Sequence, residues 1–200
     1  MSPLEVKWFL SAESAADLTP RDFVPVFHDW IRTGRIPDET LIDVADYSHM
    51  REGPGVVLVA HRSAYGIDSA GGALGLTYRL GRGPDEPLGE AERSRLELAL
   101  FRSIQACRFL EEGDPRGLLR FRTSEVRLRI LDRLRAAGAD AVAPALKQIF
   151  SGGGAVDIRE TPREDGGPFG LVVETATPVP FATLLAQLAR DMGQGGVRTS

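Results

Sequence analysis

The chain has 200 residues, of which 42% are hydrophobic and 26% are charged, the make-up of an ordinary globular protein. This length allows one domain, or at most two small ones, and a core large enough to fold without a disulfide or a metal ion. The formal net charge of −4 argues against non-specific binding of nucleic acid by the whole surface. Of the 24 basic residues, all but Lys7 and Lys147 are arginine.

The sequence predicts a cytoplasmic protein. Cys107 is the only cysteine, so neither an intramolecular disulfide nor a cysteine-based zinc cluster is possible, which suits a reducing compartment. Residues 1–7 lack the basic start and apolar run of a signal peptide. No run of eighteen uncharged apolar residues occurs, so we expect no membrane span.

The N-terminal part of the chain predicts a strand followed by a helix. Val6 to Leu10 forms the first expected strand. Thr19 and Pro20 are typical of a helix start, Pro25 delays the regular helix, and Gly34 is expected to end it. The apolar residues recur at helical spacing, at Phe23, Phe27, Trp30 and Ile31.

The middle of the chain predicts four strands and the longest helix. The strands cover 41–47, 56–60, 64–69 and 74–80, and the short gaps between the last three indicate an antiparallel meander. The apolar run 56–60 is typical of a central strand that is covered on both faces. A helix is expected over 90–112, ending at Gly113.

The C-terminal part predicts a mixture of helices and strands. After a strand over 118–122, a helix is expected from Thr123 or Ser124 to Gly138, with an apolar stripe at Val126, Ile130 and Leu134. The remaining expected elements are a helix over 140–150, a hairpin of strands 155–160 and 169–175, and a helix over 181–192 before a flexible tail, 193–200.

This order of elements predicts an α+β fold with a mostly antiparallel sheet and helices packed on one face. The elements do not alternate strictly, which argues against a parallel dinucleotide-binding sheet. We expect a single domain over 1–192. An alternative division gives two similar βαββα-like halves, 1–113 and 114–192.

Seven polar residues with chemical potential cluster between positions 43 and 68. They are Asp43, Asp46, Tyr47, His49, His61, Tyr65 and Asp68. Histidine and carboxylate side chains could hold a metal ion, for which Asp43, His49 and His61 are the candidate ligands. Histidine also titrates near neutral pH, so Asp46, His49, His61 and Asp68 are candidates for acid–base catalysis. The structural alternative is that Asp46, Ser48 and His49 cap a turn before Gly53 and that His61 ends a strand.

A cluster of arginines is the most unusual local composition. Its members are Arg120, Arg122, Arg127, Arg129, Arg133 and Arg135. Guanidinium groups bind carboxylates and phosphates in pairs of hydrogen bonds, so Arg127, Arg129 and Arg133 are candidate partner-binding residues. The alternative is that they form the solvated face of the expected helix.

Four segments carry a resemblance to other proteins: 25–31 (PVFHDWI), 41–49 (LIDVADYSH), 53–56 (GPGV) and, more weakly, 119–123 (LRFRT). In these segments the chain resembles a family of bacterial proteins of similar length to which no activity, cofactor or partner is assigned. The resemblance implies a self-contained protein and transfers no functional residue. The chain departs from the family after His61, where the family pattern is more acidic.

No complete catalytic motif is present, so the leading hypothesis is a non-enzymatic cytoplasmic protein that acts through a protein partner or a small ligand. The alternative is an enzyme, metal-dependent or acid–base, that uses Asp46, His49 and His61. No cofactor is assigned. Nucleic-acid binding ranks last because the net charge is negative and no recognition motif occurs. A homodimer would form through an open sheet edge or the helix that carries Phe27 and Trp30.

Overall fold

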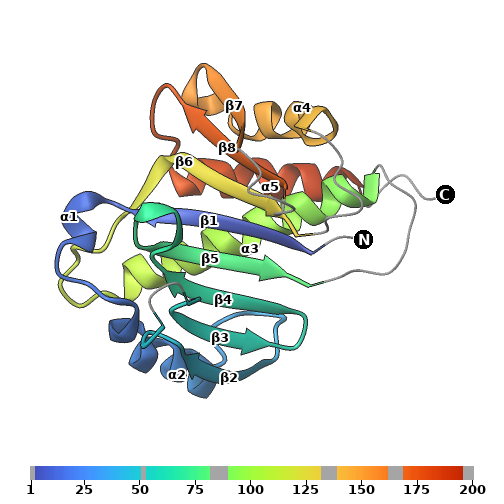
Figure 1. Ribbon diagram of the computed structural model, residues 1–200. Coiled ribbons are helices and arrows are strands. Elements are labelled where there is room, and N and C mark those ends of the chain that lie inside the picture. Colours follow the sequence, from blue (N-terminus) through green and yellow to red (C-terminus); the bar gives the residue numbers. More distant parts are fainter. Residues whose placement is uncertain (1–2, 51–52, 82–89, 132–138, 162–168, 196–200) are drawn as a thin grey trace.

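The computed structural model describes residues 3–50, 53–81, 90–131, 139–161 and 169–195. Within these residues, eight strands form one antiparallel sheet in the order β2-β3-β4-β5-β1-β6-β8-β7 (Figure 1). The strands are β1 Leu4–Leu10, β2 Leu41–Asp46, β3 Val56–Ala60, β4 Ser63–Asp68, β5 Gly75–Leu80, β6 Phe121–Ile130, β7 Val156–Thr161 and β8 Phe169–Thr175.

The N-terminal strand β1 lies in the interior of the sheet. It pairs with β5 on one side and with β6 on the other, so it joins strands from both parts of the chain. The predicted meander β3-β4-β5 and the predicted hairpin β7-β8 are both present. One continuous sheet therefore crosses the boundary between the two halves considered above.

The described residues also contain five α-helices and three short 3₁₀ turns. They are α1 Ala12–Ala15, α2 Val24–Thr33, α3 Glu90–Gly113, α4 Ala139–Ile149 and α5 Phe181–Gly195, with η1 Pro20–Phe23, η2 Ala70–Gly72 and η3 Ser151–Gly153. Figure 1 shows α2, α3 and α5 behind the sheet, and none of the five described α-helices covers its front face. The predicted α+β fold with helices packed on one face is confirmed.

The core fills the space between the sheet and these helices. The fully buried Trp8 points from β1 toward α3, where its indole Nε1 donates a hydrogen bond of 2.9 Å to the Ser103 hydroxyl. Phe181 of α5 meets the Trp8 ring edge-on at 5.1 Å. Phe27 and Trp30 are also buried in this core, so the face of α2 that carries them is not available for a dimer.

The start and end of α2 confirm the expectations from proline and glycine. The turn η1 precedes the regular helix, which starts at Val24 with Pro25 in its first turn. Gly34 ends it with a φ of 61°, in the left-handed region that favours glycine. The Phe/Trp stripe therefore has its predicted spacing and faces the sheet.

Two sequence predictions are wrong. The expected helix that begins at Thr123 or Ser124 is strand β6 as far as Ile130, and residues 132–138 lie outside the described part of the chain. The spacing of Val126 and Ile130 fits a helix, but Val126, Leu128 and Ile130 also alternate with arginines, and pairing with both β1 and β8 selects the strand. In addition, β3 is next to the sheet edge rather than central, and its side chains alternate between buried and half-buried.

None of the helices in the described part of the chain has the length and apolar character that a membrane crossing requires.

Candidate functional site

The two histidines proposed as ligands of one metal ion lie at opposite ends of a hairpin. His49 follows the end of β2 where Asp46 pairs with Val56, whereas His61 follows Ala60, which pairs with Leu41 at the other end. Val56 and Ala60 are four residues apart on β3, which is about 13 Å in a strand. Ligands of one zinc ion lie about 2 Å from it, so this register does not bring His49 and His61 to one site. Among the described residues, no group of three or more metal-ligating side chains is arranged to hold an ion.

The neighbouring carboxylates have local structural partners. Asp46 accepts hydrogen bonds from the backbone N–H and hydroxyl of Ser48, and Arg21 Nε donates to it at 3.1 Å. These hydrogen bonds, those from Ser48 most of all, lower the pKa of Asp46 to about 2. Asp43 is exposed and accepts a hydrogen bond from the Val44 N–H. Asp46 thus acts as a turn cap, in agreement with the structural alternative.

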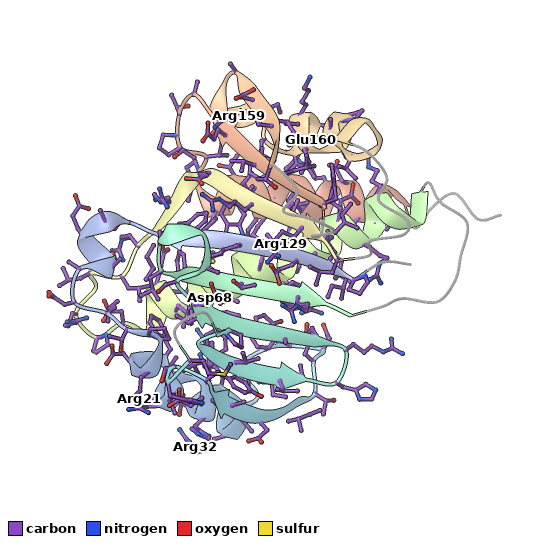
Figure 2. All side chains as sticks on the ribbon, viewed as in Figure 1. Arg21, Arg32, Asp68, Arg129, Arg159 and Glu160 are labelled. Carbon is purple, nitrogen blue, oxygen red and sulfur yellow. The ribbon has the colours of Figure 1, made fainter. Side chains whose placement is uncertain are left out.

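Asp68 belongs to a buried network on the open face of the sheet (Figure 2). Its Oδ1 accepts a hydrogen bond from Lys7 Nζ, and its Oδ2 accepts one of 2.8 Å from the Thr77 hydroxyl. Lys7 also donates to the backbone carbonyls of Asp68 and Ala70. Burial lowers the pKa of Lys7, and the Asp68 carboxylate opposes that effect. These bonds hold the β4–β5 connection against β1.

Charged side chains stand in rows across this open face. In one row Glu5 of β1 lies opposite Arg79 of β5 and Arg129 of β6. Directly opposite residues of an antiparallel pair point to the same face, so Glu5 is flanked by two guanidinium groups. Arg79 Nη2 lies 2.7 Å and Arg129 Nη1 lies 3.1 Å from the Glu5 carboxylate. In the next row, Arg127 lies opposite Lys7.

Arginines also cover an aromatic ring on this face. Phe9 is fully buried although it lies on the side of β1 that carries no helix, because Arg122 and Arg127 stack on its ring at 4.8 Å and 4.6 Å. Both guanidinium groups form ion pairs with Glu125, and Arg127 also donates to the Gly71 carbonyl. The arginines are thus held in place from several sides.

We call this surface the arginine face and define it by Arg79, Arg122, Arg127 and Arg129 above the acids Glu5, Asp68 and Glu125. The arginine side chains are 35% to 54% exposed, whereas the acidic ones are 6% to 17% exposed. The carboxylates therefore lie at the bottom of the network, and solvent meets mainly guanidinium groups. Figure 2 shows Arg129 in the middle of the open sheet face. Arg133, the third candidate partner-binding residue, lies outside the described residues.

Small apolar side chains continue the open face beyond the arginines. Val57, Val59 and Ala64 are half-buried, and Gly66 stands between Val57 and Thr77 in the same row of the sheet. These four residues of β3 and β4 carry no charge, and Asp43 of β2 lies beside Val59 at the edge of this area. The open face thus combines a cationic area with an adjoining apolar area.

A separate polar cluster lies on the opposite, helix-covered face and lines a cavity of about 350 Å³. At its centre the Glu39 carboxylate accepts hydrogen bonds from the hydroxyls of Ser63, Tyr65 (2.9 Å) and Tyr78 (3.3 Å). Burial is the main reason that the pKa values of both tyrosines are raised above the ordinary value, with nearby phenol and carboxylate groups adding to it. At neutral pH both tyrosines are hydrogen-bond donors rather than bases. The other polar residues of the lining are Arg102 of α3, Asp38 and Thr40 before β2, and His61 and Arg62 between β3 and β4.

Only some residues of these two sites can be predicted from the sequence. Composition points to Arg127 and Arg129, and clustering along the chain points to His61 and Tyr65. Sequence reasoning misses Glu39 and Arg102, because they are 63 positions apart and belong to no motif. Buried tyrosines at alternating strand positions, Tyr65 and Tyr78, were the one available signal, since a buried hydroxyl requires a partner.

No protein-family model matches this chain, and a search of curated proteins finds no similar sequence.

Proposed function

We propose that this is a non-enzymatic cytoplasmic protein that binds an acidic segment of a protein partner on its arginine face. The observation that carries the proposal is the difference in exposure between the two kinds of charge on this face. The guanidinium groups are exposed to solvent, and the carboxylates that hold them are buried beneath them. A guanidinium that is already oriented loses little conformational freedom when it binds a carboxylate, which favours affinity.

Charge complementarity selects the chemistry of the partner. The chain as a whole is negative, so a cationic area on its surface stands out against its surroundings and would steer an acidic partner toward it. Val57, Val59 and Ala64 adjoin this area and suit apolar side chains beside the acidic ones. We therefore infer a partner segment that mixes carboxylates with apolar residues.

A protein segment fits this face better than a nucleic acid does. Acidic side chains lie among the arginines, and beyond them Asp157 of β7 and Glu174 of β8 share a single guanidinium group, that of Arg159. This part of the face therefore keeps an excess of negative charge, which disfavours a long phosphate backbone. Phe9 is covered by Arg122 and Arg127, so its ring is not free to stack on a base. The fully buried free thiol of Cys107, whose pKa burial raises, supports a reducing compartment.

The first prediction concerns removal of two arginine charges. Arg127→Gln/Arg129→Gln removes two positive charges but leaves the polar chain length nearly unchanged. A random 12-residue peptide phage library is panned on both proteins. We expect the wild-type protein to enrich Asp- and Glu-containing peptides, and the variant to bind the best of them about 10- to 100-fold more weakly, as expected from the loss of two charge-assisted contacts. Fluorescence anisotropy of the labelled peptide gives the affinities.

A matched control removes the same charge from the helix-covered side. Arg32 and Arg108 are exposed on α2 and α3, so Arg32→Gln/Arg108→Gln should retain peptide binding. The proposal fails if the enriched peptides are not acidic or if both double variants bind them equally. Salt-sensitive retention on single-stranded DNA, lost only in the Arg127/Arg129 variant, would assign the face to nucleic acid instead.

A further inference from the structure

Arg102 is held in the cavity by one side of its guanidinium group. Its Nη1 donates a hydrogen bond of 2.7 Å to the Pro37 carbonyl and a longer one of 3.4 Å to Gln105. The side chain is only 14% exposed, so α3 and the segment before β2 fix its position. The guanidinium group is therefore oriented before any ligand binds.

The opposite edge of the same group, Nε with Nη2, makes no hydrogen bond to any described residue. This edge forms two long ion pairs, with a Glu39 oxygen 3.9 Å from Nε and with an Asp38 oxygen 3.7 Å from Nη2. Both distances exceed hydrogen-bonding range. Two parallel N–H groups on one edge match the two oxygens of a carboxylate.

Residues from other elements add hydrogen-bonding, charged and apolar groups to the lining of the cavity. Glu39 accepts three hydroxyl hydrogen bonds, and a carboxylate has about four acceptor positions, so one position remains for a ligand donor. His61 and Arg62 are exposed lining residues that add hydrogen-bonding and cationic groups, and Leu80 and Leu98 supply apolar surface. Asp38, whose side chain is 85% exposed, has a φ of 60°, an uncommon value for a residue other than glycine, at the start of this lining.

We propose that this cavity is a binding site for a small carboxylate that also carries a hydroxyl or amino group. The carboxylate pairs with the Nε–Nη2 edge of Arg102, with Arg62 nearby, and the hydroxyl or amino group donates to Glu39. The cavity volume of about 350 Å³ is at the lower end of the range for small-molecule sites, which suits a ligand of this size. The site lies on the helix-covered face of the sheet, so it does not depend on the arginine face.

The test screens small hydroxy- and amino-carboxylates by ligand-observed NMR at millimolar concentration, each paired with its amide and with the analogue that lacks the hydroxyl or amino group. L-malate, L-malamide and succinate form one such trio. We expect the hydroxy- or amino-carboxylates to bind and both analogues to bind at least tenfold more weakly. Isothermal titration then measures each affinity.

Variants locate the site. Arg102→Gln is expected to weaken binding at least tenfold. Arg102→Lys, which keeps the charge without the paired N–H edge, should recover only part of it. Arg62→Gln removes an exposed charge, so it leaves folding intact and should weaken binding about threefold. Arg108→Gln, an exposed position on the same helix, should bind like the wild-type protein.

The proposal is overturned if no member of the panel binds, or if the amides and the analogues without a donor bind as well as the parent acids. It is also overturned if a folded Arg102→Gln variant keeps full affinity. If Arg102→Gln does not fold, the Arg62→Gln variant decides: binding as tight as that of the wild-type protein then overturns the proposal.

Discussion

Two buried tyrosines should make the free energy of unfolding fall at alkaline pH. Tyr65 and Tyr78 donate to Glu39, and burial, first among the causes, raises the pKa of both. In the unfolded chain a tyrosine ionises near pH 10, whereas in the folded protein it stays protonated. Above about pH 10 the unfolded state therefore binds fewer protons, and the free energy of unfolding falls as the pH rises.

The prediction is that urea unfolding midpoints decrease between pH 9 and pH 11, and that Tyr65→Phe/Tyr78→Phe shows a smaller decrease. A Tyr47→Phe background removes the third tyrosine, so that phenolate absorbance reports only the buried pair. We expect this absorbance to appear together with unfolding. Phenolate absorbance that appears while circular dichroism still shows a folded protein would contradict the burial of these two tyrosines.

At the scale of single elements, β6 carries both the core and the arginine face. Val126 and Leu128 are buried between the sheet and the helices, whereas Arg127 and Arg129 point to the open side. Costs of substitution should therefore alternate along the strand. We expect Leu128→Ala to lower the free energy of unfolding by about 2–5 kcal/mol and Arg129→Ala by less than about 1 kcal/mol. Arg127→Ala should cost about 1–2 kcal/mol, because this side chain also covers the Phe9 ring. Chemical denaturation of the four single variants, Val126→Ala included, measures these costs. A loss of free energy of unfolding at Arg129 as large as that at Leu128 would contradict the alternating orientation of side chains along β6.

The same strand shows how far the sequence determines the fold. The strands predicted at 6–10, 64–69 and 74–80 match β1, β4 and β5 to within two residues at either end. In β6 the residues Glu125, Arg127 and Leu128 favour a helix as single residues, and their apolar pattern fits both periods. The strand forms because β1 and β8 offer unpaired edges on both sides, which is information from distant parts of the chain.

The two candidate sites are likewise formed by contacts between residues that are distant in sequence. Local composition points to Arg127 and Arg129, but Glu5 is more than a hundred positions away in sequence, so only the strand register places Arg129 beside it. His49 and His61 are near in sequence, which suggests a shared site, yet the hairpin separates them. Arg102 lies near Glu39 only because α3 contacts the segment before β2.

At the scale of the whole molecule, the sheet separates two sites with different chemistry. The arginine face lies on the open side, and the cavity that contains Glu39 and Arg102 lies on the helix-covered side. Lys7 and Tyr78 belong to neighbouring strands, β1 and β5, but point to opposite faces. Each site can therefore be altered by substitution without direct contact with the other.

The continuity of the sheet predicts that the chain folds as one unit rather than as halves 1–113 and 114–192. Division at Gly113 breaks the β1–β6 ladder and removes Phe150 and Phe181, whose rings lie 6.2 Å and 5.1 Å from Trp8. We expect neither fragment alone to unfold cooperatively on heating, because each exposes an unpaired strand and half of the core. In a Trp30→Phe background, the fluorescence of Trp8 should be red-shifted in fragment 1–113 and should return to its native wavelength when fragment 114–192 is added. A cooperative transition with native Trp8 emission from fragment 1–113 alone would instead support two independent halves that later joined through β1 and β6.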